Sequence, residues 1–358
     1  MKTTENNKLD FSNQRFFIGI DVHKKKWAVS VRQEGILLKT FVMNSEPEDL
    51  KNYLQKHYPG GKYISTYEAG FSGYSTDRKL KELGIENKIA HAADIPTSNK
   101  EKTRKRDKID SKKLARELEN GSIEGIYVPD EFYIELRSYC RLRYMLTKDQ
   151  TRIKNRIKSY LAFIGKRFPE NWECRNWSGN FIKYLHEIEF EYPTGKETLE
   201  LLLEELADKR KRIALVTREL KNKINECDKS IVERLYKTVP GVGFITAITL
   251  YTELIDMKRF SSIECLAAYV GLVPSTDSSG QKERVTGITN RSNRYLRYLL
   301  LEVSWTAIKE DAALLMYYNR LLKRMKKTRA IIAVARKLLS RIRHIWLSGQ
   351  DYTYGLIK

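Results

Sequence analysis

The stretch RFFIGIDVHKKKWAVSV, residues 15–31, holds two apolar segments separated by charged residues. Apolar side chains fill positions 16–18 and 20, Asp21 ends that run, three lysines follow, and a second apolar segment begins at Trp27. Two short apolar segments joined by a few polar residues predict two strands connected by a turn. A carboxylate at the end of a buried strand costs free energy unless something compensates its charge. Asp21 therefore marks the place to look for a counter-charge.

Strand and helix signals alternate through the region that follows. Three strands are predicted first, in RFFIGID, WAVSVRQ and GILLKTFVM, and then helix, strand, helix, strand and helix in turn. Ser45 is the predicted N-cap of the first helix, and the last predicted helix spans 110–118. Three consecutive strands followed by this alternation are typical of the ribonuclease-H-like fold, a mixed sheet with helices on its faces. The fold class predicted for this region is therefore α/β.

The strand signal disappears after about residue 130, and the rest of the chain reads as mainly helical. Apolar residues at helical spacing predict two long amphipathic helices, as an antiparallel hairpin or a coiled coil. Further on, TVPGVG has the pattern of a helix-hairpin-helix turn, in which Gly241 and Gly243 would offer backbone N–H groups to a phosphate. The predicted organisation is a polar tail (1–14), an α/β domain (15–130), a helical region (131–235) and a mainly helical C-terminal domain (236–358).

The charge of the chain indicates what it binds. Its 358 residues include 66 Lys and Arg against 45 Asp and Glu, a net charge of +21. Such an excess favours polyanions, above all nucleic acids, over a merely basic surface. Four scattered cysteines without a CxxC pair, a polar N-terminus and the lack of a long apolar run predict a cytoplasmic protein without a zinc finger.

Isolated carboxylates in the first region fall where a metal site would form. Asp21 ends the first predicted strand and Glu68 the fourth, and these strands are neighbours in a ribonuclease-H-like sheet. Asp107 and Asp110 lie three residues apart at a helix start, hence on one face. Four such carboxylates would suit Mg²⁺ or Mn²⁺. The alternative for the Asp pair is an ordinary helix cap. His23 is not assigned as a ligand.

A polar segment near the C-terminus offers a candidate nucleophile. STDSSGQKERVTG is predicted to be a loop, and the helix after it carries Arg291, Arg294 and Arg297, which would balance a phosphate charge. A serine in this loop could attack a phosphodiester, whereas an ordinary flexible loop is the alternative. Further candidates for contacts with a nucleic-acid backbone are Lys24, Arg104, Arg106 and the basic tail 323–343. The alternative is that these basic residues form plain solvated faces.

Five motifs in order carry a family resemblance: GIDVHKK, YEAG, RDKIDSKKLA, VPGVG and AAYVGLVP…SSG…GITNRSNRYLR. From about residue 16 to 345 the chain resembles the DEDD transposases of bacterial insertion sequences, in the one-ten/eleven-eleven group that includes the Piv-type DNA invertases. The resemblance implies a RuvC-like N-terminal domain, a coiled-coil middle and a C-terminal transposase domain. It maps the family's acidic set onto Asp21, Glu68, Asp107 and Asp110, and its nucleophilic serine onto Ser279, with Ser278 adjacent.

The same resemblance implies partners and a mechanism. Family members use a structured noncoding bridge RNA that pairs with donor and target DNA, and they act as tetramers whose active sites combine two subunits. The expected function is an RNA-guided recombinase with a covalent phosphoserine intermediate. One departure lies in residues 288–293, where Ser292 replaces a family glycine. A hydrolytic metal-dependent RuvC-like nuclease and a non-enzymatic basic nucleic-acid-binding scaffold are the alternatives.

Overall fold

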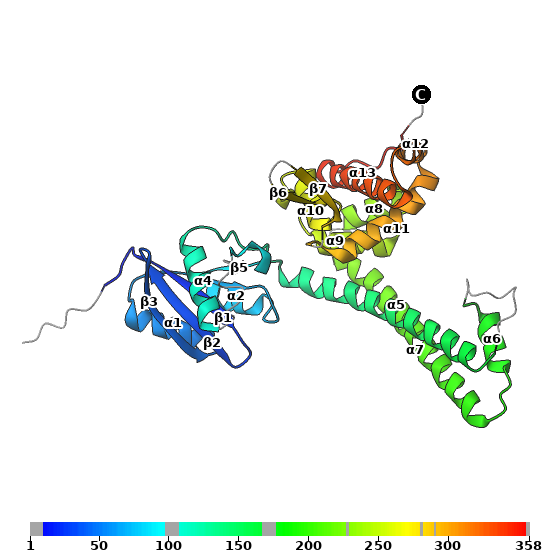
Figure 1. Ribbon diagram of the computed structural model, residues 1–358, viewed down its shortest axis with the longest axis horizontal. Helices are drawn as coiled ribbons and strands as arrows, with labels where there is room; N and C mark the ends of the chain where they lie inside the picture. The colour runs from blue at the N-terminus through cyan, green and yellow to red at the C-terminus, as the bar shows by residue number, and fades with distance from the viewer. Residues whose placement is uncertain are drawn as a thin grey trace, which may run out of the picture. The chain divides into compact units, whose positions relative to one another are not determined.

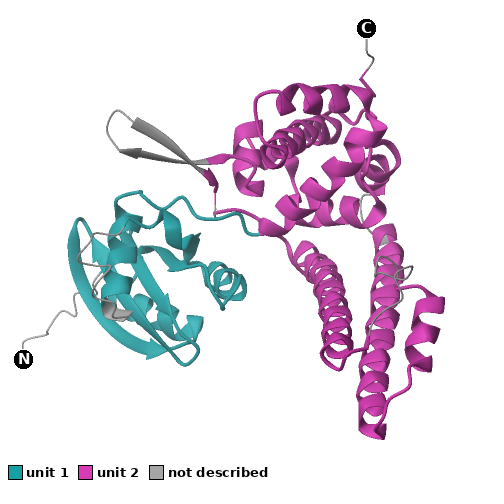
Figure 2. Cartoon of the chain, turned by 45° about the vertical axis from the view of Figure 1, so that its right-hand side comes forward, with its two compact units in different colours: residues 1–128 teal, residues 129–358 magenta. Residues whose placement is uncertain are grey.

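A computed structural model describes residues 10–96, 107–166, 177–226, 229–279, 282–289 and 291–355, without the side chains of residues 107, 108, 226, 275–279 and 282–286. The chain divides into two compact units, residues 1–128 and 129–358, coloured separately in Figure 2. Within the described ranges, no helix is both long enough and apolar enough to cross a membrane.

The first unit is a mixed five-stranded sheet with helices on both faces (Figure 1). The strand order is β3-β2-β1-β4-β5, with β2 antiparallel to both of its neighbours, β1 and β3, and with β1, β4 and β5 parallel. The elements are β1 (Arg15–Val22), β2 (Lys26–Gln33), β3 (Ile36–Asn44), α1 (Pro47–His57), β4 (Lys62–Glu68), α2 (Ser75–Glu82), β5 (Glu86–Ala90), the 3-10 turn η1 (Ala92–Asp94) and α4 (Asp107–Glu119). The structure confirms the predicted order of strands and helices, and it confirms that the first and fourth strands are neighbours.

The two faces of this sheet are covered by different helices. Phe16, Ile18 and Ile20 of β1 pack in one core with residues of α1 and α2, and Phe17 packs on the other face with Leu114 of α4. A Cβ added at Gly19 would lie only 2.1 Å from the carbonyl oxygen of Ser111 and 2.4 Å from the amide nitrogen of Ala115. Glycine at this position therefore allows α4 to lie directly against β1.

Two local predictions in the first unit need correction. The first strand does not end at Asp21 but continues to Val22, because Val22 still pairs with Trp27 of β2. The N-cap of α1 is Glu46, without a side-chain cap. Ser45 instead donates its hydroxyl to the carbonyl oxygen of Lys24, which joins two turns at the same end of the sheet.

The second unit begins with two long antiparallel helices. They are α5 (Glu131–Phe163) and α7 (Pro193–Lys223), joined through α6 (Gly179–Glu187) (Figure 1). Arg143 donates to Thr217 at 2.8 Å, and Arg156 pairs with Glu205 at 3.3 Å. Later residues of α5 therefore contact earlier residues of α7, as expected for antiparallel helices. Buried leucines and isoleucines of both helices share a core with Phe181 and Leu185 of α6. The predicted pair of long helices is confirmed.

The remainder of this unit is a helical domain that also encloses one end of the long helices. Its elements are the 3-10 turn η3 (Ile224–Glu226), α8 (Lys229–Thr238), α9 (Phe244–Leu254), the 3-10 turn η4 (Met257–Arg259), α10 (Ile263–Val270), β6 (Pro274–Ser279), β7 (Lys282–Ile288), α11 (Arg294–Glu310), α12 (Ala312–Leu322) and α13 (Lys327–Ser348). Leu136 of α5 and Leu220 of α7 belong to the same core as α9, α11 and α13. The predicted boundary between a helical region (131–235) and a C-terminal domain (236–358) stays a prediction.

The prediction of a polar loop for STDSSGQKERVTG is wrong. It forms an antiparallel pair, β6 with β7, in which Ser279 pairs with Lys282 and Pro274 with Ile288. The run Ser-Thr-Asp-Ser-Ser lacks the large β-branched and aromatic residues by which strands are recognised from sequence.

Candidate active site

The sheet register brings Asp21 and Glu68 side by side. Ile20 of β1 pairs with Tyr67 of the parallel strand β4, so the next residue of each strand, Asp21 and Glu68, occupies an equivalent position. Successive residues of a strand alternate between faces, which puts Asp21 on the same face as Gly19, the face that α4 covers. Glu68 shares that face by the register. The two acidic positions predicted at the ends of strands one and four therefore lie at the same end and on the same face of the sheet.

Helix α4 runs opposite to β1, and its first turn lies toward this same end. Near the helix middle, Ser111 hydrogen-bonds Ser30 at 2.9 Å, and Ser30 pairs with Gly19. At the last residue, Glu119 pairs with Arg32 at 2.7 Å, and Arg32 pairs with Phe17. The helix thus moves away from Asp21 as the chain advances. Its first turn, with Asp107 and the half-buried Asp110, begins at the carboxylate end.

Asp21 is partly exposed to solvent and lies beside a histidine. Its side chain remains 23% exposed, and its Oδ2 lies 3.3 Å from Nε2 of His23. Residues two apart in an extended segment share a face, which is the signal in the sequence for this contact. Asp21 therefore does not carry a fully desolvated charge at a strand end.

The donors at this end suit a hard divalent cation. Among the side chains that the structure describes, no group of three or more His, Cys, Asp or Glu is placed to hold a metal ion. Mg²⁺, however, normally keeps several waters and binds through only one or two protein carboxylates together with substrate phosphates. Asp21 and Glu68, adjacent on one face, supply such a pair. These two carboxylates therefore fit the ligand preference of the ion. The side chain of Asp107 is not among those that the structure describes.

The predicted nucleophile is on the hairpin of the second unit. Ser279 is the last residue of β6 and pairs with Lys282, and Ser278 pairs with Glu283. At the base of the hairpin, Arg297 of α11 donates to the carbonyl oxygens of Thr289, at 2.9 Å, and Gly271, at 3.4 Å. These two bonds hold the end of β7 against the end of α10, so Arg297 fixes where the hairpin leaves the domain.

A buried carboxylate anchors the same base and was not singled out from the sequence. Glu253 of α9 is fully buried and receives two hydrogen bonds from Arg141 of α5, at 2.7 and 2.9 Å. It also accepts from Nδ2 of Asn293 at 2.8 Å, and Arg137 lies 3.8 Å away. Asn293 in turn caps α11 through Leu296. The signal in the sequence is a single glutamate in the otherwise uncharged segment FITAITLYTEL.

We expect Glu253→Gln to lower the free energy of unfolding by about 3 kcal/mol. The change leaves the charges of Arg137 and Arg141 beside a neutral group; breaking a buried ion pair from one side costs about 3–5 kcal/mol, and the half-exposed Arg141 puts the expected loss at the low end of that range. Chemical denaturation of the full chain measures the loss. The control is Glu302→Gln on the exposed surface of α11, expected to change stability by less than about 0.5 kcal/mol. Equal stability of the two variants would contradict the role given to Glu253.

The predicted nucleic-acid contacts lie in different settings. Lys24 is exposed in the turn between β1 and β2, and Arg291 and Arg294 are exposed around the start of α11. Arg104 and Arg106 lie outside the described residues. Gly241 has a φ of +74° and donates its N–H to Glu310 at 3.0 Å, and a Cβ there would meet the carbonyl oxygen of Val303 at 2.7 Å. Its N–H is thus already engaged within the domain.

Gly243 has a different role in the same turn. It is the N-cap of α9, it is exposed, and a Cβ added to it would meet nothing within 4 Å. The turn between α8 and α9 therefore uses one glycine for close packing on α11 and the other for the start of a helix. Its backbone remains open to a large partner at Gly243.

Comparison with known proteins matches two segments of the chain, and the first of them extends past residue 128 into the second unit. Residues 18–165 match a family model for a transposase of the DEDD type, and residues 233–319 match the model described as the transposase IS116/IS110/IS902 family. Two Sinorhizobium fredii proteins named as transposases, y4qE and y4rJ, are 27% and 26% identical, covering 81% and 90% of this chain and 71% and 89% of their own lengths. The Coxiella burnetii transposase for insertion sequence element IS1111A is 28% identical, over 66% of this chain and 65% of its own.

The chain is a DNA transposase. Both matched segments are similar to DEDD transposases of the IS110/IS116 group, and the first match begins within β1 of the RuvC-like sheet. The first segment contains Asp21, Glu68, Asp107 and Asp110; the second contains Ser279 and Glu253. The transposase acts on DNA, and a domain of the DEDD type uses divalent metal ions.

Proposed function

We propose that this transposase is an RNA-guided DNA recombinase that cuts and rejoins donor and target DNA through a phosphoserine link. The observation that carries the proposal is the placement of the acidic positions. The β1–β4 register and the direction of α4 bring Asp21, Glu68 and the Asp107–Asp110 turn to one end of the sheet. A carboxylate set of this kind supports metal-dependent chemistry on a phosphodiester.

In the proposed reaction, Asp21, Glu68, Asp107 and Asp110 hold Mg²⁺ or Mn²⁺ near the scissile phosphate. The bound ion would polarise the phosphate oxygens and stabilise the charge of the attacking and leaving oxygens. The Oγ of Ser279 forms a bond to phosphorus and gives up its proton to water, while the displaced DNA oxygen takes up a proton. A hydroxyl of the partner strand then attacks the phosphoserine and releases the serine, so one phosphodiester replaces another without ATP.

The proposed assembly is a tetramer in which active sites combine two subunits. Its support is that the acidic set lies in the first unit and Ser279 in the second, so the two halves of the chemistry are on separately folded parts of the chain. We propose domains at 15–130, 131–235 and 236–358, with α5 and α7 as a coiled coil between subunits and the α8–α9 turn as a helix-hairpin-helix that contacts DNA. A relation to the Piv invertases belongs to the same proposal.

The proposed guide is a structured noncoding bridge RNA, which would select donor and target by base pairing, while the net charge of +21 supports backbone binding. Purification of the full chain from cells that also carry the DNA flanking its gene should recover one enriched RNA from that DNA. Sequencing the copurified RNA makes the measurement. The matched control is Asp21→Asn, which leaves the basic surfaces intact and should recover the same RNA. Recovery of random cellular RNA would overturn the guided model.

A further inference from the structure

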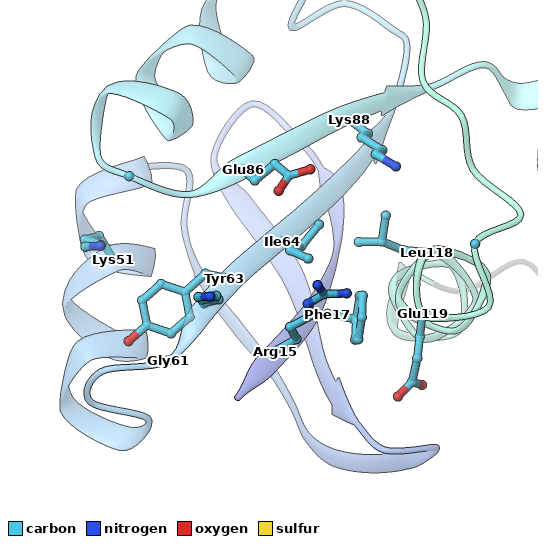
Figure 3. A pocket seen from close by; sticks show the side chains of 13 residues that line it. Arg15, Phe17, Lys51, Gly61, Tyr63, Ile64, Glu86, Lys88, Leu118 and Glu119 are labelled. Atoms are coloured by element: carbon cyan, nitrogen blue, oxygen red, sulfur yellow. The ribbon is translucent and has the colours of Figure 1, made fainter. Parts of the chain in front are cut away.

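A hollow of about 720 Å³ lies in the first unit at the edge where the parallel strands begin (Figure 3). Arg15 and Lys62, the first residues of β1 and β4, pair directly in the sheet and lie on its lining. Lys88 of β5 and Lys51 of α1 contribute two more cations. Asp21 and Glu68 lie at the opposite ends of β1 and β4, so this hollow is separate from the candidate metal site.

The lining carries an excess of positive charge that the protein itself leaves uncompensated. Two carboxylates also line the hollow, Glu86 and Glu119, but Glu119 is already paired with Arg32 at 2.7 Å and accepts from the amide of Gly35. Within the described ranges, none of the four lining cations forms an ion pair with a carboxylate. Four cations therefore face one uncommitted carboxylate, and an anionic ligand would complete the balance.

Two of these cations are held in place before any ligand arrives. The ammonium of Lys51 lies 5.1 Å from the centre of the Tyr63 ring, a cation–π contact. Lys88 is half-buried, and a Cβ added at Gly125 would lie 3.3 Å from the Cβ of Lys88, so the neighbouring segment confines its stem. Preordered cations lose less side-chain freedom when they bind a phosphate.

The shape of the hollow distinguishes among anionic ligands. Its apolar lining includes Phe17, Ile64 and Leu118, and its cations begin on three adjacent parallel strands. Strands about 4.8 Å apart spread the cations of β1, β4 and β5 over about 10 Å, so that they would contact successive phosphates of one strand and not a single phosphate. A row of cations beside an apolar floor fits a polynucleotide, whose phosphates and bases present both kinds of surface.

We propose that this hollow binds the phosphate backbone of a nucleic-acid strand, at a site distinct from the carboxylate end where DNA would be cut. The site would hold a strand at the end of the sheet opposite to the chemistry. It goes beyond the recombinase mechanism, since it requires neither Ser279 nor a metal ion.

The test uses the full chain with two fluorescein-labelled 20-nucleotide probes of one sequence, a single-stranded RNA and a single-stranded DNA. The double variant Lys62→Glu/Lys88→Glu should raise Kd about tenfold at moderate salt. It should also reduce the slope of log K against log salt by about 1.4, since each lost contact on a single strand removes about 0.7. Weaker binding of the RNA probe, the DNA probe or both by the double variant supports the site and identifies its ligand.

The matched control is Lys39→Glu/Lys79→Glu, which changes the net charge equally at exposed lysines on β3 and α2, away from the hollow. The control should leave the slope unchanged. If charge reversal disturbs folding, Lys62→Gln/Lys88→Gln serves as a milder variant: it removes the two charges without reversing them and should raise Kd by a smaller factor. Equal effects of the hollow and control variants, or no effect at the hollow, would overturn the proposal. Neither outcome depends on whether a phosphoserine forms.

Discussion

Ser279→Ala should abolish the covalent link between this transposase and DNA and lower recombination by at least about 10⁴-fold. The substitution removes the only protein atom that the proposed mechanism bonds to phosphorus, and loss of the nucleophile costs about 10⁶ in a covalent protease. The measurement is a denaturing gel of the protein incubated with labelled donor and target DNA, in which a protein–DNA adduct migrates more slowly than free DNA. The variant should show no such band.

The adjacent serine provides the matched control for this experiment. Ser278 and Ser279 are consecutive residues of β6, and consecutive positions of a strand lie on opposite faces. Ser278→Ala should therefore retain the adduct and most of the recombination. An adduct that survives Ser279→Ala but not Ser278→Ala would move the nucleophile by one residue. Normal cleavage by both variants, without any adduct, would favour a hydrolytic nuclease with the carboxylates alone.

Asp21→Asn should lower metal-dependent strand cleavage by about 10³-fold or more. Asparagine keeps the size of the side chain but removes the negative charge beside Glu68, where we place the divalent ion. Metal stabilisation of a reacting phosphate contributes several kcal/mol, and each 1.36 kcal/mol is a factor of ten in rate. Initial rates of cleavage, measured over a series of Mg²⁺ and Mn²⁺ concentrations, test this expectation.

A carboxylate elsewhere in the same unit controls for charge and folding. Asp49 lies exposed on α1, the helix that covers the other face of the sheet. Asp49→Asn should cleave at the normal rate with the normal metal dependence. The carboxylate assignment fails if Asp21→Asn retains full activity, and so does any enzymatic role for this end of the sheet. That result would support a basic scaffold instead.

The order of elements in the first unit could be predicted because each strand and helix there carries its own signal. Short apolar runs bounded by turns marked the strands, and residues 110–118 marked most of α4. The long helices α5 and α7 were equally visible, since their apolar residues repeat at helical spacing. Asp21 and Glu68 were identifiable for the same local reason: each is a charge at the end of an apolar run.

The hairpin and its anchors depended on contacts between distant residues. The polar strand β6 is defined by its pairing with β7, which no local apolar pattern records. Glu253 gains its role from Arg141, more than a hundred residues earlier, and from Asn293, forty residues later. The hollow arises likewise from strand starts that lie side by side only in the folded sheet.

The sequence by itself determined which residues are able to do chemistry and which segments form the main helices and the central sheet. Those properties follow from local composition and spacing, which act over a few residues. Only the tertiary structure decided which of these groups meet, because register, helix direction and buried ion pairs join residues that are far apart in the chain. Asp21 illustrates both: its charge is a property of the sequence, whereas its partners, Glu68 beside it and the start of α4 above it, are a property of the fold.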